Sequence, residues 1–321
     1  MTTLAVLSDI HGNLPALQAV TAHLAGFSPD VVIVAGDMIN VGPHSQAVLE
    51  FIAAQGWTMM RGNHEFYLLH HRTPREPAHW QGYTTPRWLR QSISPDWQRR
   101  LAVLPDALTL HFDDAPLLYI THGLPNDPWT GVYPDMADAL LAEKLAGVPA
   151  PYMVTAHIHL PFERVIPRAD GGTLTIINPG SAGLPLDGIA ATASYALLTS
   201  HGDRWEVGHQ RIPYDVDALL ADCEASDYLH WNGVTGLLYM DEFRTARMRV
   251  WPFERWKAEQ HPHEPNTRAL VDEFLALGDG IFEYYDINYW MNLPEGVRER
   301  WPDGPRFSVH HGRVVRVPAR P

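Results

Sequence analysis

Asp9 and His11 stand two residues apart, directly after a short apolar run at residues 4–7. On a strand, residues i and i+2 point to the same side, so this carboxylate and this imidazole can converge on one point. The two ligand types together suit a divalent metal ion. A lone Asp-x-His pair is more often a surface pair or a cap, so the rest of the chain has to decide its meaning.

Four further segments place polar, ligand-type residues after an apolar run. They are VVIVAGD (31–37), RGNHE (61–65), HG (122–123) and HIH (157–159). Open α/β sheets build their sites at the carboxyl ends of strands, which is where each of these segments is expected to lie. The combined candidate set is Asp9, His11, Asp37, Asn63, His64, His122, His157 and His159.

The chemistry of this set indicates bound metal. Carboxylates and neutral imidazoles suit Mn, Fe, Zn or Ni, and the set contains no thiolate that would select a soft metal. It also holds more ligands than one ion needs. A carboxylate such as Asp37 can bridge two ions, and a pair about 3.5–4 Å apart is used in hydrolytic phosphoryl chemistry. We therefore expect two divalent metal ions as cofactors, with Mn²⁺ as the first choice.

The elements that position these residues alternate between strand and helix patterns. Apolar residues recur at helical spacing over 14–24, the unbroken run 31–34 predicts a buried parallel strand, and a second helix is expected over 45–54. This order predicts parallel strands with right-handed crossovers. After residue 155 the pattern changes to a predicted meander of antiparallel strands. We therefore expect an α/β fold, a four-layer α-β-β-α sandwich of two mixed sheets flanked by helices.

Two regions differ from this pattern. Residues 71–100, rich in Pro, Arg, Trp and Gln, predict an excursion over the surface with one short helix near 95–104. Residues 226–321 hold five tryptophans and one predicted helix at 266–277, and they are too aromatic to be disordered. We expect a domain of residues 1–225 and a C-terminal, mainly helical or irregular appendage of residues 226–321. The appendage would cap the domain or form the interface of a homo-oligomer.

Composition limits the partners and the location. The formal net charge of -13 disfavours non-specific nucleic-acid binding, which needs a cationic surface. We expect no membrane partner, because no apolar run reaches the roughly 18 residues that a span requires. The single Cys223 excludes an internal disulfide, and residues 1–15 lack the pattern of a signal peptide. These features predict a cytoplasmic location.

In this order, the motifs D-x-H, G-D, G-N-H-E, H-G and H-x-H resemble the five blocks of the calcineurin-like metallophosphoesterase superfamily. The later segment Asn178-Pro179-Gly180-Ser181 resembles a block of its small prokaryotic phosphodiesterase-like branch, although N-P-G-S is also strong turn chemistry. The metal ligands that the resemblance implies are Asp9, His11 and His159 for one ion, Asn63, His122 and His157 for the other, and Asp37 as the bridge.

The resemblance also implies a mechanism, in which a hydroxide held between the metals attacks phosphorus and His64 protonates the leaving group as general acid. One departure concerns the substrate. Ser/Thr phosphatases of the superfamily typically show Asp-Arg three and four residues after the bridging Asp, where this chain has Asn40 and Val41. The carboxylate partner of His64 and an arginine that grips phosphate are therefore missing at those positions.

A phosphate monoester carries more charge than a diester and benefits more from an arginine. The sequence therefore favours a phosphodiesterase whose partner is a small or nucleotide-like phosphoester substrate. A phosphomonoesterase or nucleotide phosphatase is the alternative, and a non-catalytic binding scaffold is a third interpretation.

Overall fold

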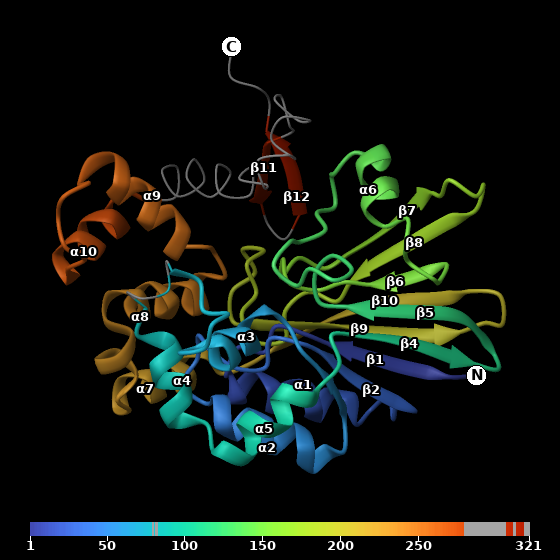
Figure 1. Cartoon of the computed structure of the whole chain (residues 1–321), viewed down its shortest axis with the longest axis horizontal. Helices are drawn as coiled ribbons and strands as arrows, with labels where there is room; N and C mark the ends of the chain where they lie inside the picture. Colours follow the sequence, from blue (N-terminus) through green and yellow to red (C-terminus); the bar gives the residue numbers. More distant parts are fainter. Residues whose placement is uncertain (79, 81–82, 279–305, 311–312, 318–321) are drawn as a thin grey trace.

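The computed structural model of the chain describes residues 1–78, 80, 83–278, 306–310 and 313–317 (Figure 1). Its centre is a pair of five-stranded mixed sheets, with strand orders β10-β9-β1-β2-β3 and β4-β5-β6-β8-β7. The strands of the first sheet are β1 (Thr3–Leu7), β2 (Val31–Ala35), β3 (Thr58–Met60), β9 (Thr192–Ser200) and β10 (Trp205–Pro213). Those of the second are β4 (Ala107–Phe112), β5 (Ala115–Thr121), β6 (Tyr152–Val154), β7 (Phe162–Pro167) and β8 (Thr173–Asn178).

Helices cover the outer face of each sheet, so the predicted four-layer sandwich is confirmed. The first sheet is covered by α1 (Leu14–Leu24), α2 (Ser45–Gln55), α3 (Asn63–His70), α4 (Thr85–Ser92), α5 (Pro95–Val103) and α7 (Val216–Ala225). The second sheet carries α6 (Asp138–Lys144), on the opposite side of the molecule (Figure 1).

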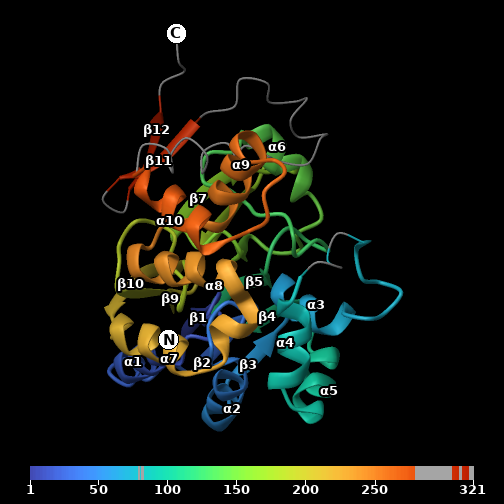
Figure 2. The ribbon, with the colours of Figure 1, turned by 90° about the vertical axis from the view of Figure 1, so that its left-hand side faces the viewer.

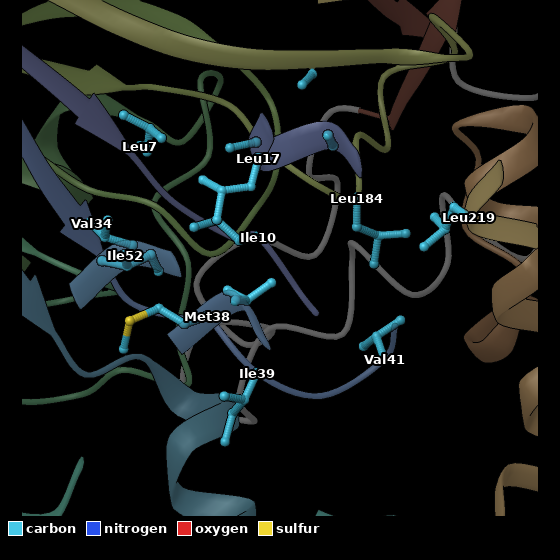
Figure 3. Packing of buried hydrophobic residues seen from close by; sticks show 14 of the residues in the cluster. Leu7, Ile10, Leu17, Val34, Met38, Ile39, Val41, Ile52, Leu184 and Leu219 are labelled. Atoms are coloured by element: carbon cyan, nitrogen blue, oxygen red, sulfur yellow. The ribbon is translucent and has the colours of Figure 1, made fainter. Parts of the chain in front are cut away.

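Successive side chains of strand β1 point alternately into two layers of the core. Leu4 and Val6 are fully buried against the second sheet, whereas Ala5 and Leu7 face the helices of the outer layer. Successive strand side chains point to opposite faces, so an unbroken apolar run is what a strand buried on both faces requires. Figure 3 shows Leu7 in the helix-side cluster, which also includes Val41 on the loop after β2.

Strand direction follows the prediction in the first sheet and in part of the second. β1, β2 and β3 are parallel, as expected from the β-α-β-α-β order. The antiparallel arrangement predicted after residue 155 is confirmed for the pairs β7–β8 and β9–β10, but it is wrong for the other edge of β8, which pairs parallel with β6. β7 lies outside β8 at the sheet edge, so β8 is free to pair with β6.

The excursion predicted for residues 71–100 contributes to the core. It contains α4 as well as the expected α5, and Trp88, Leu89 and Ile93 belong to the cluster that covers the first sheet. Pro86 lies in the first turn of α4, where a proline is compatible with a helix. The proline and arginine content therefore concealed an amphipathic helix.

The C-terminal region is more regular than predicted. It contains α8 (Tyr228–Thr245), α9 (Val250–Gln260) and the expected α10 (Arg268–Ala276), and a hairpin of β11 (Arg306–His310) with β12 (Arg313–Val317). α8 to α10 lie at the end of the sandwich toward which β1 runs (Figures 1 and 2). Phe243 of α8 packs in the helix-side cluster of the main domain, whereas Phe253 and Phe274 form a cluster of their own. The boundary at residue 225 stays a prediction.

None of the described helices is long and apolar enough to cross a membrane.

Candidate metal centre

The candidate ligands lie in loops that follow the carboxyl ends of parallel strands. Asp9 and His11 follow β1, and Asp37 follows β2. His122 follows β5 of the other sheet, and His157 follows β6. The two sheets therefore present their ligands toward one another at the same edge of the sandwich, as the strand-end pattern predicted.

The backbone reaches this arrangement through turns rather than through strand alternation. β1 ends at Leu7, so the predicted convergence of Asp9 and His11 by i, i+2 spacing on a strand is wrong in its cause. Left-handed φ angles occur at Asp9 (53°), His11 (51°), Asp37 (55°), His157 (72°) and His159 (60°). Such angles are uncommon outside glycine and gather where the surrounding structure holds a functional site.

Backbone hydrogen bonds between the loop after β1 and the loop after β2 hold these turns. The backbone N–H of Asp9 donates to the carbonyl of Gly36 at 3.1 Å, and that of His11 donates to the carbonyl of Asp37 at 2.9 Å. Gly62 is needed because a Cβ there would lie 2.2 Å from Asp37 Oδ1. The loops after β1, β2 and β3 are therefore packed backbone against backbone.

The first group of candidate ligands consists of Asp9, His11 and His159, all buried. His159 Nε2 lies 3.3 Å from Asp9 Oδ1 and 3.2 Å from His11 Nε2. All three ligand atoms lie within 4.8 Å of one another, so a single cation can contact them together.

The second group consists of Asp37, His122 and His157, together with Asn63. His122 Nε2 lies 3.2 Å from Asp37 Oδ2. Asn63 Oδ1 lies 3.0 Å from His122 Nε2 and 2.9 Å from His157 Nδ1, so the amide oxygen stands among the imidazole nitrogens. An oxygen and two nitrogens are thus directed at one point next to the carboxylate.

Asp37 connects the two groups. Its Oδ2 lies 3.2 Å from His122 Nε2 in the second group and 3.7 Å from His11 Nε2 in the first. The carboxylate of Asp37 therefore lies between the two candidate groups.

The model of the calcineurin-like phosphoesterase family matches residues 2–161, which contain all five strand-end blocks. The chain belongs to this family. Members of the family are metal-dependent phosphoester hydrolases, which agrees with the ligand groups found here.

Other proteins are similar to this phosphoesterase in sequence or in fold. It is 25% identical over 228 residues to an uncharacterized protein of Methanocaldococcus jannaschii, MJ0912, a match that covers 66% of this chain and 88% of the relative. The fold is similar to a metallophosphoesterase from Sphaerobacter thermophilus, with a TM-score of 0.58, 20% identity, and coverage of 75% of this chain and 100% of that one. For the hypothetical protein PH1004 from Pyrococcus horikoshii the TM-score is 0.63, with 18% identity and coverage of 78% and 100%.

The electrostatics of this phosphoesterase fit bound cations. Among the described residues, Asp9 Oδ1 is buried without a hydrogen-bond partner. Burial works to raise the pKa of Asp9, but the charge of His159, whose Nε2 lies 3.3 Å from Asp9 Oδ1, outweighs it, and the pKa falls to about 2. Burial and the charge of His122 lower the pKa of His157 to about 4, so its imidazole offers a lone pair at neutral pH. An ionised carboxylate and a neutral imidazole are the forms that bind metal.

His122 shows the attraction of the site for positive charge. Burial works to lower its pKa, but the charge of Asp37 and its hydrogen bond raise the pKa to about 10. Nδ1 of the same ring lies 2.8 Å from the carbonyl oxygen of Ala35, which orients Nε2 toward Asp37. Such an outer hydrogen bond is the usual means by which a metal-binding histidine is oriented.

Glu65 has a role that the sequence did not reveal, although it belongs to the G-N-H-E block. Its buried carboxylate accepts hydrogen bonds from the backbone N–H groups of Asp37 (3.0 Å), Met38 (2.9 Å) and Gly62 (2.7 Å). It therefore ties the loop that carries Asp37 to the loop that carries Asn63. The capping-box position of Glu65, three residues after Gly62, was the available signal.

Side chains of the N-P-G-S segment (178–181) donate hydrogen bonds to the backbone of the loops that carry the candidate ligands. Ser181 Oγ donates to the carbonyl of Asp9 at 2.7 Å, and Asn178 Nδ2 donates to the carbonyl of Ala156 at 2.9 Å. Both side chains bond the backbone at or next to a ligand, so they do more than form a turn. Neither belongs to the ligand groups.

His64 lies beside Asp37 and is only partly buried. Its Nε2 is 4.0 Å from Asp37 Oδ2, and its side chain is 18% exposed. Its Nδ1 lies 2.9 Å from Nδ2 of Asn40. Asn40 thus occupies the place next to His64 where the family resemblance predicted that a carboxylate is missing.

Proposed function

We propose that this phosphoesterase is a phosphodiesterase that uses two divalent metal ions and acts on small or nucleotide-like phosphodiesters. The observation that carries the proposal is the position of Asp37 between the two ligand groups, at 3.2 Å from His122 Nε2 and 3.7 Å from His11 Nε2. Two ions bound there would polarise the phosphoryl oxygens and lower the pKa of bound water toward about 7. Mn²⁺ is the first choice among Mn, Fe, Zn and Ni, which this oxygen and nitrogen donor set accepts.

His64 acts on the side of the leaving group in this proposal. Asn40 Nδ2 can only donate, so Nδ1 of His64 accepts and the ring proton lies on Nε2. Burial lowers the pKa of His64 more strongly than the charge of Asp37 raises it, which favours the neutral ring. The Nε2–H group is thus available to donate a hydrogen bond to the oxygen that leaves phosphorus.

The segment after Asp37 supports a diester substrate. Val41, at the position where an arginine is typical of the phosphatases, is 1% exposed and packs in the helix-side cluster. Its side chain offers no positive charge to a terminal phosphate. A dianionic monoester would lack the bidentate partner that compensates its extra charge, and a monoanionic diester needs that partner less.

The test is hydrolysis of bis(4-nitrophenyl) phosphate beside 4-nitrophenyl phosphate by metal-stripped protein with and without added Mn²⁺. We expect Mn²⁺-dependent cleavage chiefly of the diester and loss of turnover in Asp37→Ala. Preference for the monoester would make the phosphatase alternative correct. Equal rates in Asp37→Ala and the unaltered protein would contradict the proposed site.

A further inference from the structure

Three aromatic rings form a group that contacts His64 through one of its members, Tyr67. Tyr67 follows His64 by three residues on α3, and residues at this spacing share one face of a helix. The two ring centroids are 5.3 Å apart in an edge-to-face arrangement. Tyr67 therefore stands directly beside the imidazole that faces the leaving group.

Two tryptophans from other segments complete the group. Trp80 stacks on Tyr67 with centroids 4.4 Å apart and an interplanar angle of 30°. Trp129 contacts both rings, at 5.5 Å from Tyr67 and 5.7 Å from Trp80. Trp80 is only 2% exposed and packs against the other two rings. Trp129 is 41% exposed and presents aromatic surface to solvent.

The loop that carries Trp129 is held in place beside the ligands. It follows His122, and it is closed by a backbone hydrogen bond of 2.9 Å from Leu124 N–H to the carbonyl of Thr130. The N–H of Trp129 itself donates to Asp127 Oδ1 at 3.0 Å. A Cβ built on Gly131 would lie 3.2 Å from Cδ2 of His157, so the loop passes close to the second ligand group.

We infer that Tyr67, Trp80 and Trp129 form an aromatic subsite that binds a planar aromatic part of the leaving group, such as a nucleobase or an aryl ring. The inference rests on the proposed function. Its observation is the contact of Tyr67 with His64 together with the packing of Trp129 against Tyr67, which places aromatic surface beside the imidazole assigned to the leaving group. Stacking on aromatic side chains is tolerant of which ring is bound and contributes to affinity beyond buried area.

The subsite can be tested by binding without turnover. Benzyl(methyl)phosphinate and (cyclohexylmethyl)(methyl)phosphinate are monoanions like a phosphodiester and have nearly the same size, and their two P–C bonds resist hydrolysis. Calorimetric titration of the Mn²⁺-loaded full chain should show about three- to tenfold tighter binding of the benzyl compound, which is the size of an aromatic pair contribution. Trp129→Ala should bring this ratio close to one. Trp251→Ala is the matched control, since Trp251 is 40% exposed on α9, and it should retain the ratio.

A ratio near one in the unaltered protein, or a ratio that Trp129→Ala leaves intact, would overturn the subsite. The same holds if neither phosphinate binds to a protein that cleaves bis(4-nitrophenyl) phosphate. Tyr67→Leu provides a second variant, and it should also reduce the ratio. The proposed function fails separately, through absence of Mn²⁺-dependent turnover of any phosphoester, because the binding ratio is measured without turnover.

Discussion

The side-chain amide of Asn40 donates a hydrogen bond to Nδ1 of His64 across 2.9 Å. The orientation of the amide is set by Val41, whose backbone N–H donates to Asn40 Oδ1 at 2.7 Å. Both residues have left-handed φ angles, 74° for Asn40 and 68° for Val41, and this is a strained conformation for a β-branched residue. The strain is consistent with a loop built to hold the amide against the imidazole.

This contact predicts how the leaving group affects the rate. An imidazole whose Nδ1 accepts a hydrogen bond donates from Nε2 but is a weak proton donor, so turnover should fall steeply as the leaving alcohol becomes less acidic. Asn40→Asp supplies a carboxylate that can accept from Nδ1–H and stabilise the imidazolium, and the dependence should become flatter. The measurement is kcat/KM for a series of substituted aryl methyl phosphodiesters. Identical slopes for the two proteins would contradict the assigned role of Asn40.

Close backbone packing predicts that Gly62 cannot carry a side chain. A Cβ there would lie 2.2 Å from Asp37 Oδ1 and 2.7 Å from Cε1 of His122, so Gly62→Ala must displace a carboxylate oxygen or an imidazole. We expect Mn²⁺ affinity to fall by about 10–100-fold, as for other residues that position ligands. Gly147→Ala is the control, because nothing lies within 4 Å of a Cβ at that position. Equal Mn²⁺ affinity of the two variants in calorimetric titrations would refute this packing argument.

Ser181 should contribute to stability as well as to the site. Its hydroxyl donates to the carbonyl of Asp9 and accepts from the N–H of Leu184, each at 2.7 Å. Ser181→Ala leaves both buried groups without this partner, which costs about 1–3 kcal/mol of unfolding free energy. Ser92→Ala, at the exposed end of α4, should change that free energy by less than about 0.5 kcal/mol. Urea denaturation of both variants provides the comparison.

The pH dependence of stability should carry a contribution from Glu242. Burial is the main cause that raises its pKa to about 7, although its Oε1 accepts hydrogen bonds from the N–H groups of Arg249 (2.7 Å) and Val250 (2.9 Å). Because the folded protein holds this proton more tightly than the unfolded chain, the contribution is fully present below about pH 4.5 and is lost as the pH rises through about 7.

Glu242→Gln removes that titration and should retain the two backbone hydrogen bonds. The unaltered protein should therefore lose stability relative to Glu242→Gln between pH 5 and pH 8, by on the order of 2–3 kcal/mol. Urea denaturation at several pH values measures the difference. A constant difference over this range would show that Glu242 is ionised in the folded protein throughout.

The set of candidate ligands could be predicted because each motif is a short, continuous stretch of sequence next to an apolar run. Asp37, for example, follows an unbroken apolar strand and is separated from it by only one residue, Gly36. The relation of Asn40 to His64 was not predictable in this way, since it depends on the left-handed turn at residues 40–41 and on the packing of two loops 24 residues apart. Tyr67 and Trp129 are still farther apart in the sequence. Tyr67 lies on α3, which covers the first sheet, whereas Trp129 lies on the loop after β5 of the second sheet.

The fold, too, could be predicted from the sequence only in part. Hydrophobic pattern alone indicated the parallel strands of the first sheet, because β1 and β2 are buried on both faces. It did not indicate the pairing of β6 with β8, which depends on where β7 is placed rather than on the composition of either strand. α4 was missed because a proline and two arginines obscured the apolar residues Trp88 and Leu89.

The most direct test of the central claim, that Asp37 joins two metal ions, is electron paramagnetic resonance of metal-stripped protein titrated with Mn²⁺. The account predicts two bound ions per chain and a spectrum of two magnetically coupled ions. Asp37→Ala should lose the coupling. Binding of a single ion, or of two ions without coupling in the unaltered protein, would contradict it.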